Sequence, residues 1–419
     1  MSDFKVSNYA PSFYIGDTTQ GISSAVFHDP NFSSFNNRSS VSMITGAPGS
    51  GKTFLAMTLC AQAAVAGKMT VVIDPKADFI ALKNLEGDLG KVRVLELSED
   101  SRQGIIDPFV ICGEDKTEGV ILAKEIIKIF TNITDLPFEV IDPILEDVSV
   151  QDNANLNSVV DKLLGFDREN NPVQSERVRN IGMMLRTISK MPLARLAFAN
   201  PYNVPERVSL KEGLTILTML DLRLPEADQP KEEYSEPNRL SSGLMFLVTD
   251  YVHKVMKAKT EGLPKVLIID EAWAVLQNQA GASVVRSVSR MGRSLNMAMV
   301  LITQNAGHVS GFGIENTITT YFAFSTNGQE GNRITEMMGL RDPEEDEPRD
   351  FSRMMSDLNN GECLMRDWRQ RYATVQISSY KKDWATAFKT NPLDKARAAA
   401  EKKEREKKER SERKKVSAR

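Results

Sequence analysis

The sequence has few of the residues that build disulfide frameworks and metal centres. It holds three cysteines and three histidines in 419 residues, and the cysteines show no CxxC spacing. No apolar run approaches the about 18 residues that a membrane-spanning helix requires. The opening stretch, MSDFKVSNYA, lacks the charged-then-apolar order of a signal peptide. These absences argue against a secreted, disulfide-bonded or zinc-binding protein, and we expect a cytoplasmic one.

Charge of one sign is concentrated only near the C-terminus. Residues 395–419 hold 12 Lys or Arg and 5 Glu, a net of +7, whereas the rest of the chain holds 41 basic and 51 acidic residues, a net of −10. Such a basic tail can contact nucleic acid or an anionic membrane surface, and a solubilising role is the alternative. The acidic remainder argues against a protein that coats DNA.

Short apolar runs alternate with helical patterns over most of the chain. Strands are predicted at 41–45, 70–74, 92–97, 214–220, 265–270, 297–303 and 318–325, with a closing hairpin near 361–377. Because helices separate the strands, we expect an α/β fold with a mostly parallel central sheet and helices on both faces. Residues 113–208 show helical periodicity without a convincing strand and are predicted to form an α-helical insertion.

The strongest motif is GAPGSGKT, at 46–53, between a predicted strand and a predicted helix. Its glycines let the backbone fold closely around an anion, with N–H groups and the helix N-terminus facing phosphate oxygens. Lys52 can reach the β- and γ-phosphates of ATP, and the Thr53 hydroxyl can bind Mg²⁺. The predicted nucleotide-binding residues are Gly46, Pro48, Gly49, Ser50, Gly51, Lys52, Thr53 and Phe54.

A second motif, KVLIIDEAWAVL at 265–276, runs from a buried strand into two adjacent acids. Carboxylates are costly to bury in such a place unless a cation or a reaction needs them. Asp270 can hold Mg²⁺ through a water, and Glu271 can orient and polarise the water that attacks the γ-phosphate. Many phosphate-loop kinases and small GTPases lack this second acid, so its presence favours hydrolysis coupled to mechanical work.

Two further features fit an ATP-hydrolysing site. Gln304 ends the strand predicted at 297–303, where it can hydrogen-bond the γ-phosphate and report its presence. The preceding segment, RSVSRMGRSLN, carries Arg286, Arg290 and Arg293. One of these arginines can project into a neighbouring subunit's site and stabilise transition-state charge, and contacts with DNA or solvent are the alternative for each.

A third stretch, VVIDPKADF, ends the strand predicted at 70–74. Ligands bind beyond the carboxyl ends of parallel strands, so Asp74, Lys76 and Asp78 can line the same edge as the motifs above. A structural role in the turn is the alternative.

Taken in order, GAPGSGKT, VVIDPK, LIIDEAW, RMGRSLNMAMVLITQ and LNNGECLMRD resemble the HerA–FtsK superfamily of motor ATPases. The DEAW stretch followed by an Arg-rich helix and a strand ending in TQ is most similar to the conjugative type IV secretion ATPases. The lead-in YIGDTTQGISSAVFHDP is also similar to theirs. The resemblance covers roughly residues 13 to 380.

This resemblance implies a RecA-like phosphate-loop ATPase that uses ATP and Mg²⁺. Gly51, Lys52 and Thr53 match its nucleotide-binding loop, the Walker A motif. Asp270 and Glu271 match the metal-side and catalytic acids of the Walker B motif, Gln304 the sensor, and Arg290 or Arg293 the region of the intersubunit arginine. Members of the superfamily assemble as hexameric rings, so the resemblance also implies a homo-hexamer.

The expected organisation has five parts. A small β-rich lead-in occupies 1–40, the two parts of the ATPase core occupy 41–112 and 209–385, the α-helical insertion occupies 113–208, and the basic low-complexity tail occupies 386–419. Conjugative ATPases carry a large N-terminal domain, whereas about 40 residues precede the loop here. That difference argues against channel docking and favours a stripped motor of a phage or mobile element.

Three functions are compatible with these observations. The first is a motor for conjugative DNA transfer or type IV secretion, working with membrane channel proteins at the inner face of the membrane. The second is a DNA translocase or genome-packaging ATPase. The third is a nucleotide-dependent regulatory module with little turnover, against which Glu271 and Gln304 argue.

Overall fold

The computed structural model describes most of the chain, and the statements below concern that part. The described residues are 13–35, 38–167, 169, 171–205, 213–226, 229–258, 262–276, 279–304, 306–309, 314–326, 328–340 and 352–388. The predicted basic tail lies outside them beyond residue 388, as do the first 12 residues of the lead-in.

A single mixed sheet runs through the molecule in the order β2-β1-β11-β10-β9-β3-β8-β7-β4-β6-β5. Its strands are β1 (Tyr14–Thr18), β2 (Ala25–Phe27), β3 (Val41–Thr45), β4 (Met69–Asp74), β5 (Val92–Glu96), β6 (Leu214–Thr218), β7 (Lys265–Ile269), β8 (Met297–Thr303), β9 (Ile318–Phe324), β10 (Glu362–Arg366) and β11 (Tyr372–Ile377). Neighbours from β9 to β5 pair in parallel, and those from β2 to β9 pair antiparallel. The mostly parallel sheet predicted from the sequence is confirmed.

Helices cover both faces of this sheet. The α-helices are α1 (Phe32–Phe35), α2 (Lys52–Val65), α3 (Glu86–Leu89), α4 (Pro108–Cys112), α5 (Lys116–Thr131), α6 (Phe138–Ser149), α7 (Leu156–Leu164), α8 (Pro172–Ser189), α9 (Glu236–Ala258), α10 (Trp273–Leu276), α11 (Gln279–Leu295), α12 (Gly328–Met337), α13 (Ser352–Ser356) and α14 (Lys382–Ala387). The 3₁₀ turns are η1 (Asp78–Leu85), η2 (Pro192–Leu196), η3 (Lys231–Glu233), η4 (Ala306–His308) and η5 (Glu315–Thr317).

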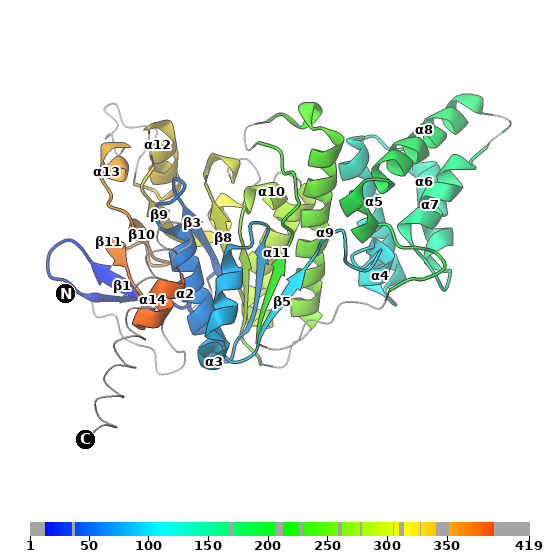
Figure 1. Cartoon of the computed structure of the whole chain (residues 1–419). Helices are drawn as coiled ribbons and strands as arrows, with labels where there is room; N and C mark the ends of the chain where they lie inside the picture. The colour runs from blue at the N-terminus through cyan, green and yellow to red at the C-terminus, as the bar shows by residue number, and fades with distance from the viewer. Residues whose placement is uncertain are drawn as a thin grey trace, which may run out of the picture.

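An apolar core lies on each face of the sheet, between the sheet and the helices that cover it. One holds α2 and α14 against the sheet, and the other packs α9, α11 and the helices α4 to α8 on the opposite face. The helices α5 to α8, which lie in the stretch predicted to be helical, gather at one end of the molecule, far from β1 and β2 (Figure 1). Strands β3, β4, β7 and β8 are buried along their whole length, because helices cover both of their faces.

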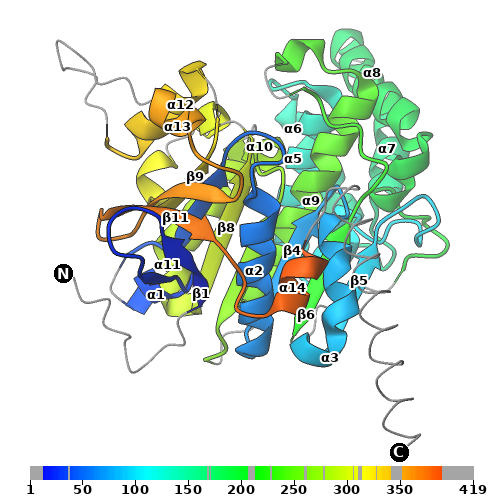
Figure 2. The ribbon, with the colours of Figure 1, turned by 60° about the vertical axis from the view of Figure 1, so that its left-hand side comes forward.

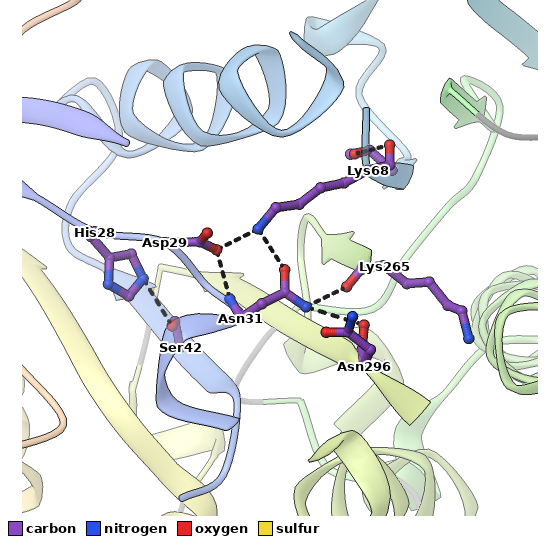
Figure 3. A network of polar contacts seen from close by, with 8 residues as sticks. His28, Asp29, Asn31, Ser42, Lys68, Lys265 and Asn296 are labelled. Carbon is purple, nitrogen blue, oxygen red and sulfur yellow. Dashed lines mark hydrogen bonds and ion pairs between the residues drawn. The ribbon is translucent and has the colours of Figure 1, made fainter. Parts of the chain in front are cut away.

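The lead-in is fastened to the amino ends of the central strands by a buried polar network (Figure 3). The Lys68 ammonium donates to Asp29 Oδ1 at 2.5 Å and to Asn31 Oδ1 at 2.9 Å. The Asn31 amide donates in turn to the carbonyls of Lys265, at 3.1 Å, and Asn296, at 3.2 Å. These contacts satisfy polar groups that would be costly to bury alone. They fix the amino edge of the sheet and leave the carboxyl edge for the site.

None of the helices in the described ranges is both long and apolar enough to cross a membrane.

Candidate functional site

The loop between β3 and α2 is held in a tight fold by the residues around it. Gly46 and Gly51 have φ angles of 142° and 115°. A Cβ on Gly46 would lie 2.7 Å from Phe324 Cβ, and one on Gly51 would lie 2.9 Å from Gly361 Cα. Only glycine fits both positions, because the backbone is left-handed and the neighbours are close. The LNNGE stretch singled out by the sequence therefore buttresses the loop.

Hydrogen bonds fix the loop from both sides. The Ala47 N–H donates to the Ser325 carbonyl at 2.8 Å, and the Gly361 N–H donates to the Ser50 carbonyl at 2.9 Å. The Ser50 hydroxyl donates to the Ala47 carbonyl at 2.7 Å. Pro48 and Gly49 are exposed at the tip of the loop. Hydrogen bonds thus hold the loop to the end of β9 on one side and to the turn before β10 on the other.

Lys52 points into this loop from the first turn of α2. Its ammonium donates to the carbonyls of Gly46 and Ala47, both at 2.7 Å. Burial lowers the pKa of Lys52 to about 8, against the opposing charges of Asp270 and Glu271. The charges of those two acids act on Lys52 across the carboxyl edge of the sheet.

Strand order explains why these groups meet. In the sheet β8 lies between β3 and β7, and β4 lies beyond β7. Parallel strands end at the same edge, so the segments after β3, β4, β7 and β8 converge there. Figure 2 shows the P-loop helix α2 running beside this sheet, with α10 near its upper edge.

Glu271 receives three hydrogen bonds from three segments. Its Oε1 accepts from the Lys76 ammonium and, at 2.9 Å, from Gln304 Nε2. Its Oε2 accepts from Trp273 Nε1 at 2.5 Å. Burial acts to raise the pKa of Glu271, but the bonds to Lys76, Trp273 and Gln304 outweigh burial and lower it. The carboxylate is therefore ionised at neutral pH, as a base must be.

The neighbouring acid, Asp270, has the opposite environment. Burial, with the charges of Glu271 and Asp74, raises its pKa to about 7. Burial also raises the pKa of Asp74 to about 6, and Asp74 Oδ1 has no hydrogen-bond partner among the described residues. A divalent cation would offset this crowded negative charge, and the Thr53 hydroxyl and Asp270 carboxylate are oxygen ligands that Mg²⁺ prefers. The donor set therefore fits Mg²⁺.

Glu271 and Ala77, which follows Lys76, adopt left-handed backbone conformations that residues other than glycine rarely take. The φ angle of Ala77 is 60° and that of Glu271 is 51°. Strain of this kind costs about 1–3 kcal/mol per residue and is concentrated at functional sites. The two strained residues lie next to or within the Lys76–Glu271 ion pair.

Not every predicted site residue joins this cluster. Arg290 is exposed on α11, in the part of the helix that approaches the amino end of β8, where a Cβ on Gly292 would lie 2.7 Å from the Met297 carbonyl oxygen. Arg290 therefore lies toward the amino edge of the sheet, whereas Glu271 follows the carboxyl end of β7. The side chain of Arg293 lies outside the described residues. Phe54 packs edge-on against Phe388 of α14, with ring centroids 5.6 Å apart.

The sequence alone assigned no role to Trp273. For Lys76 it left two alternatives, lining the ligand edge of the sheet or a structural role in the turn. The Trp in DEAW follows the acid by two positions, which is a local signal for their contact. The Lys76 contact joins residues 195 positions apart and depends on the adjacency of β4 and β7.

The chain is similar to known proteins in sequence and in fold. The family model described as an AAA-like domain matches residues 31–388. The uncharacterized protein YddE of Bacillus subtilis (strain 168) is 25% identical over 378 residues, which cover 84% of this chain and 43% of YddE. The chain thus spans less than half the length of that curated relative. The structure of VirB4 of Thermoanaerobacter pseudethanolicus superposes with a TM-score of 0.70 at 15% identity, covering 90% of this chain and 99% of that one.

The VirB4 superposition confirms the RecA-like α/β fold. With the motif order and the family match over most of the sequence, it leads to one assignment: the chain belongs to the AAA-like domain family of HerA–FtsK-type ATPases.

Proposed function

We propose that this chain is an ATP-hydrolysing motor subunit that works as a homo-hexameric ring in conjugative DNA transfer or type IV secretion. The observation that carries the proposal is the meeting of the Lys52 loop, Asp270 and the Glu271–Gln304 pair at one sheet edge. The motif resemblance to conjugative ATPases and the fold shared with VirB4 support the secretion setting.

Each residue has a role in the proposed reaction. The loop N–H groups and the Lys52 ammonium bind the phosphates of ATP, so Lys52 exchanges its loop carbonyls for phosphate oxygens. Glu271 orients the attacking water and accepts its proton. Mg²⁺ bound by Thr53 and Asp270 would neutralise charge on the phosphates.

Gln304 couples the site to movement. Its amide donates to Glu271 Oε1 and lies at the end of the strand between the loop and the acids. A change at the γ-phosphate is therefore transmitted to Gln304 through Glu271. An arginine of the adjacent subunit, Arg290 or Arg293, completes the charge pattern in the ring.

The test is steady-state ATP hydrolysis by the purified chain with and without duplex DNA, with Glu271→Gln as the background. A secretion motor is expected to show low turnover that duplex DNA does not change and that the variant abolishes. Strong stimulation by DNA that falls steeply with salt would instead support a DNA translocase or packaging motor. Wild-type turnover equal to that of Glu271→Gln would contradict an ATPase of either kind.

A further inference from the structure

The Glu271 carboxylate has little capacity left for a water molecule. An ionised carboxylate offers about four acceptor positions on its two oxygens. Oε1 already accepts from Lys76 and Gln304, and Oε2 accepts from Trp273. The Lys76 ammonium also neutralises the charge that makes Glu271 a base. In this arrangement one acceptor position, on Oε2, remains for the water that Glu271 would activate.

The three donors differ in how easily they can leave. Trp273 is buried in α10, and Gln304 directly follows the last residue of the buried strand β8. Lys76 lies in the turn after β4, and its side chain is 50% exposed, whereas that of Glu271 is 7% exposed. A lysine ammonium sits on a flexible four-carbon stem and is strongly hydrated. Water can therefore take over the ammonium of Lys76 at low cost, whereas Trp273 is buried and Gln304 is only half-buried.

The turn that carries Lys76 is itself constrained. Asp74 accepts from the Phe79 N–H at 2.8 Å and so closes the turn, while Ala77 takes a left-handed conformation. Pro75 restricts the backbone directly before Lys76. The turn thus fixes the backbone from which the Lys76 side chain reaches Glu271, and a shift of the turn would move the ammonium away from the carboxylate.

We propose that Lys76 is a positioning residue that latches Glu271 and keeps basal ATP turnover low. The inference rests on the proposed ATP hydrolysis at this site. Opening of the latch frees one acceptor position on Oε1 and removes the cation that offsets the negative charge of Glu271, while Trp273 and Gln304 keep the carboxylate in place.

The experiment compares kcat and KM for ATP in the wild-type chain, Lys76→Met and Lys76→Arg. Lys76→Met removes the charge and keeps the stem, so kcat is expected to rise about tenfold, the change that ~1.4 kcal/mol of lost restraint produces. KM should change little, because Lys52 and the loop still bind the phosphates. Lys76→Arg should restore low turnover, since it keeps a cation that can pair with Glu271.

Matched controls separate the latch from other effects. Lys83→Met removes a lysine of η1 with similar exposure, 48%, from its ion pair with Glu86 of α3, and it should leave kcat unchanged. Lys76→Met combined with Glu271→Gln should be as inactive as Glu271→Gln alone, because the gained turnover passes through Glu271. Affinity for a fluorescent ATP analogue verifies that each variant is folded.

Two results would overturn the inference. Only one of them would also reject the proposed ATPase activity. Unchanged or reduced kcat in Lys76→Met, with measurable wild-type turnover, rejects the latch and leaves the ATPase assignment intact. No turnover in any variant, Lys76→Met included, rejects both.

Discussion

At the scale of residues, the adjacent acids Asp270 and Glu271 have pKa values that their surroundings shift in opposite directions. Burial raises the pKa of Asp270 to about 7, whereas the donors around Glu271 lower the pKa of Glu271 despite its burial. Neighbouring carboxyl groups whose pKa values are pushed apart generally have different roles. In the proposed function Glu271 is the base, and Asp270 is the group whose charge a cation would offset.

Lys52→Ala tests the binding half of the site. The variant removes the ammonium that lies on the loop carbonyls, so affinity for a fluorescent ATP analogue is expected to fall at least about 30-fold, roughly 2 kcal/mol for a lost charge-assisted contact. Fluorescence anisotropy measures the dissociation constant, with Lys83→Ala as the control. Unchanged affinity in Lys52→Ala would show that nucleotide does not bind at this loop.

The sequence alone could predict the positions whose chemistry is local. Lys52 and Thr53 follow a glycine loop, and Asp270 and Glu271 end an apolar strand, so both motifs are readable without a structure. The contact of Lys76 with Glu271 was not readable, because it depends on which strands become neighbours.

At the scale of elements, the buried carboxyl group of Asp107 joins the segments at the start and at the end of the helical region from α4 to α8. Asp107 caps α4 and accepts from the N–H groups of Phe109 at 3.1 Å, Leu156 at 2.9 Å and Ala199 at 2.9 Å. These donors come from three separate segments, so one side chain ties α4, α7 and the segment after η2 together.

Asp107→Ala should therefore destabilise the chain strongly. Three buried N–H groups would lose their acceptor, and we expect the free energy of unfolding to fall by ~3 kcal/mol or more. Urea denaturation measures this loss. Asp115→Ala, which removes the exposed cap of α5, should cost only about 1 kcal/mol. Equal losses in the two variants would contradict the fastening role of Asp107.

The same residue gives a pH dependence of known sign. Burial raises the pKa of Asp107 to about 7 from an ordinary value of 3.8. The folded state therefore retains a proton that the unfolded chain releases, and the stability from this group is full below about pH 4 and lost as the pH rises through 7. Subtracting the stability of Asp107→Asn from that of the wild type between pH 4 and 8 should give a difference that declines with pH. A difference that grows with pH would show that Asp107 is ionised when folded.

The strands were predictable as elements, but their order was not. Apolar runs at 41–45, 265–270 and 297–303 correspond closely to β3, β7 and β8. That β8 inserts between β3 and β7, and so brings Gln304 onto Glu271, follows from long-range pairing that a single sequence does not encode locally.

At the scale of the whole molecule, the proposed ring brings a second subunit to each site. Arg290 is exposed on α11, in the part of the helix near the amino end of β8, and we propose that it acts in the site of a neighbouring subunit. Arg290→Ala is expected to keep nucleotide binding and to lose turnover. Mixing it with Glu271→Gln should restore part of the activity, because mixed rings contain interfaces with an intact arginine and an intact acid. A mixture as inactive as its two components would exclude Arg290 as the intersubunit arginine.

The most direct measurement of the central claim compares ATP binding and ATP hydrolysis in the same preparation of Glu271→Gln. The account predicts a dissociation constant within about twofold of the wild type and a kcat lower by about 10²–10⁴-fold, the range for loss of a general base. Hydrolysis at the wild-type rate with normal binding would contradict it, since Glu271 would then have no part in activating water.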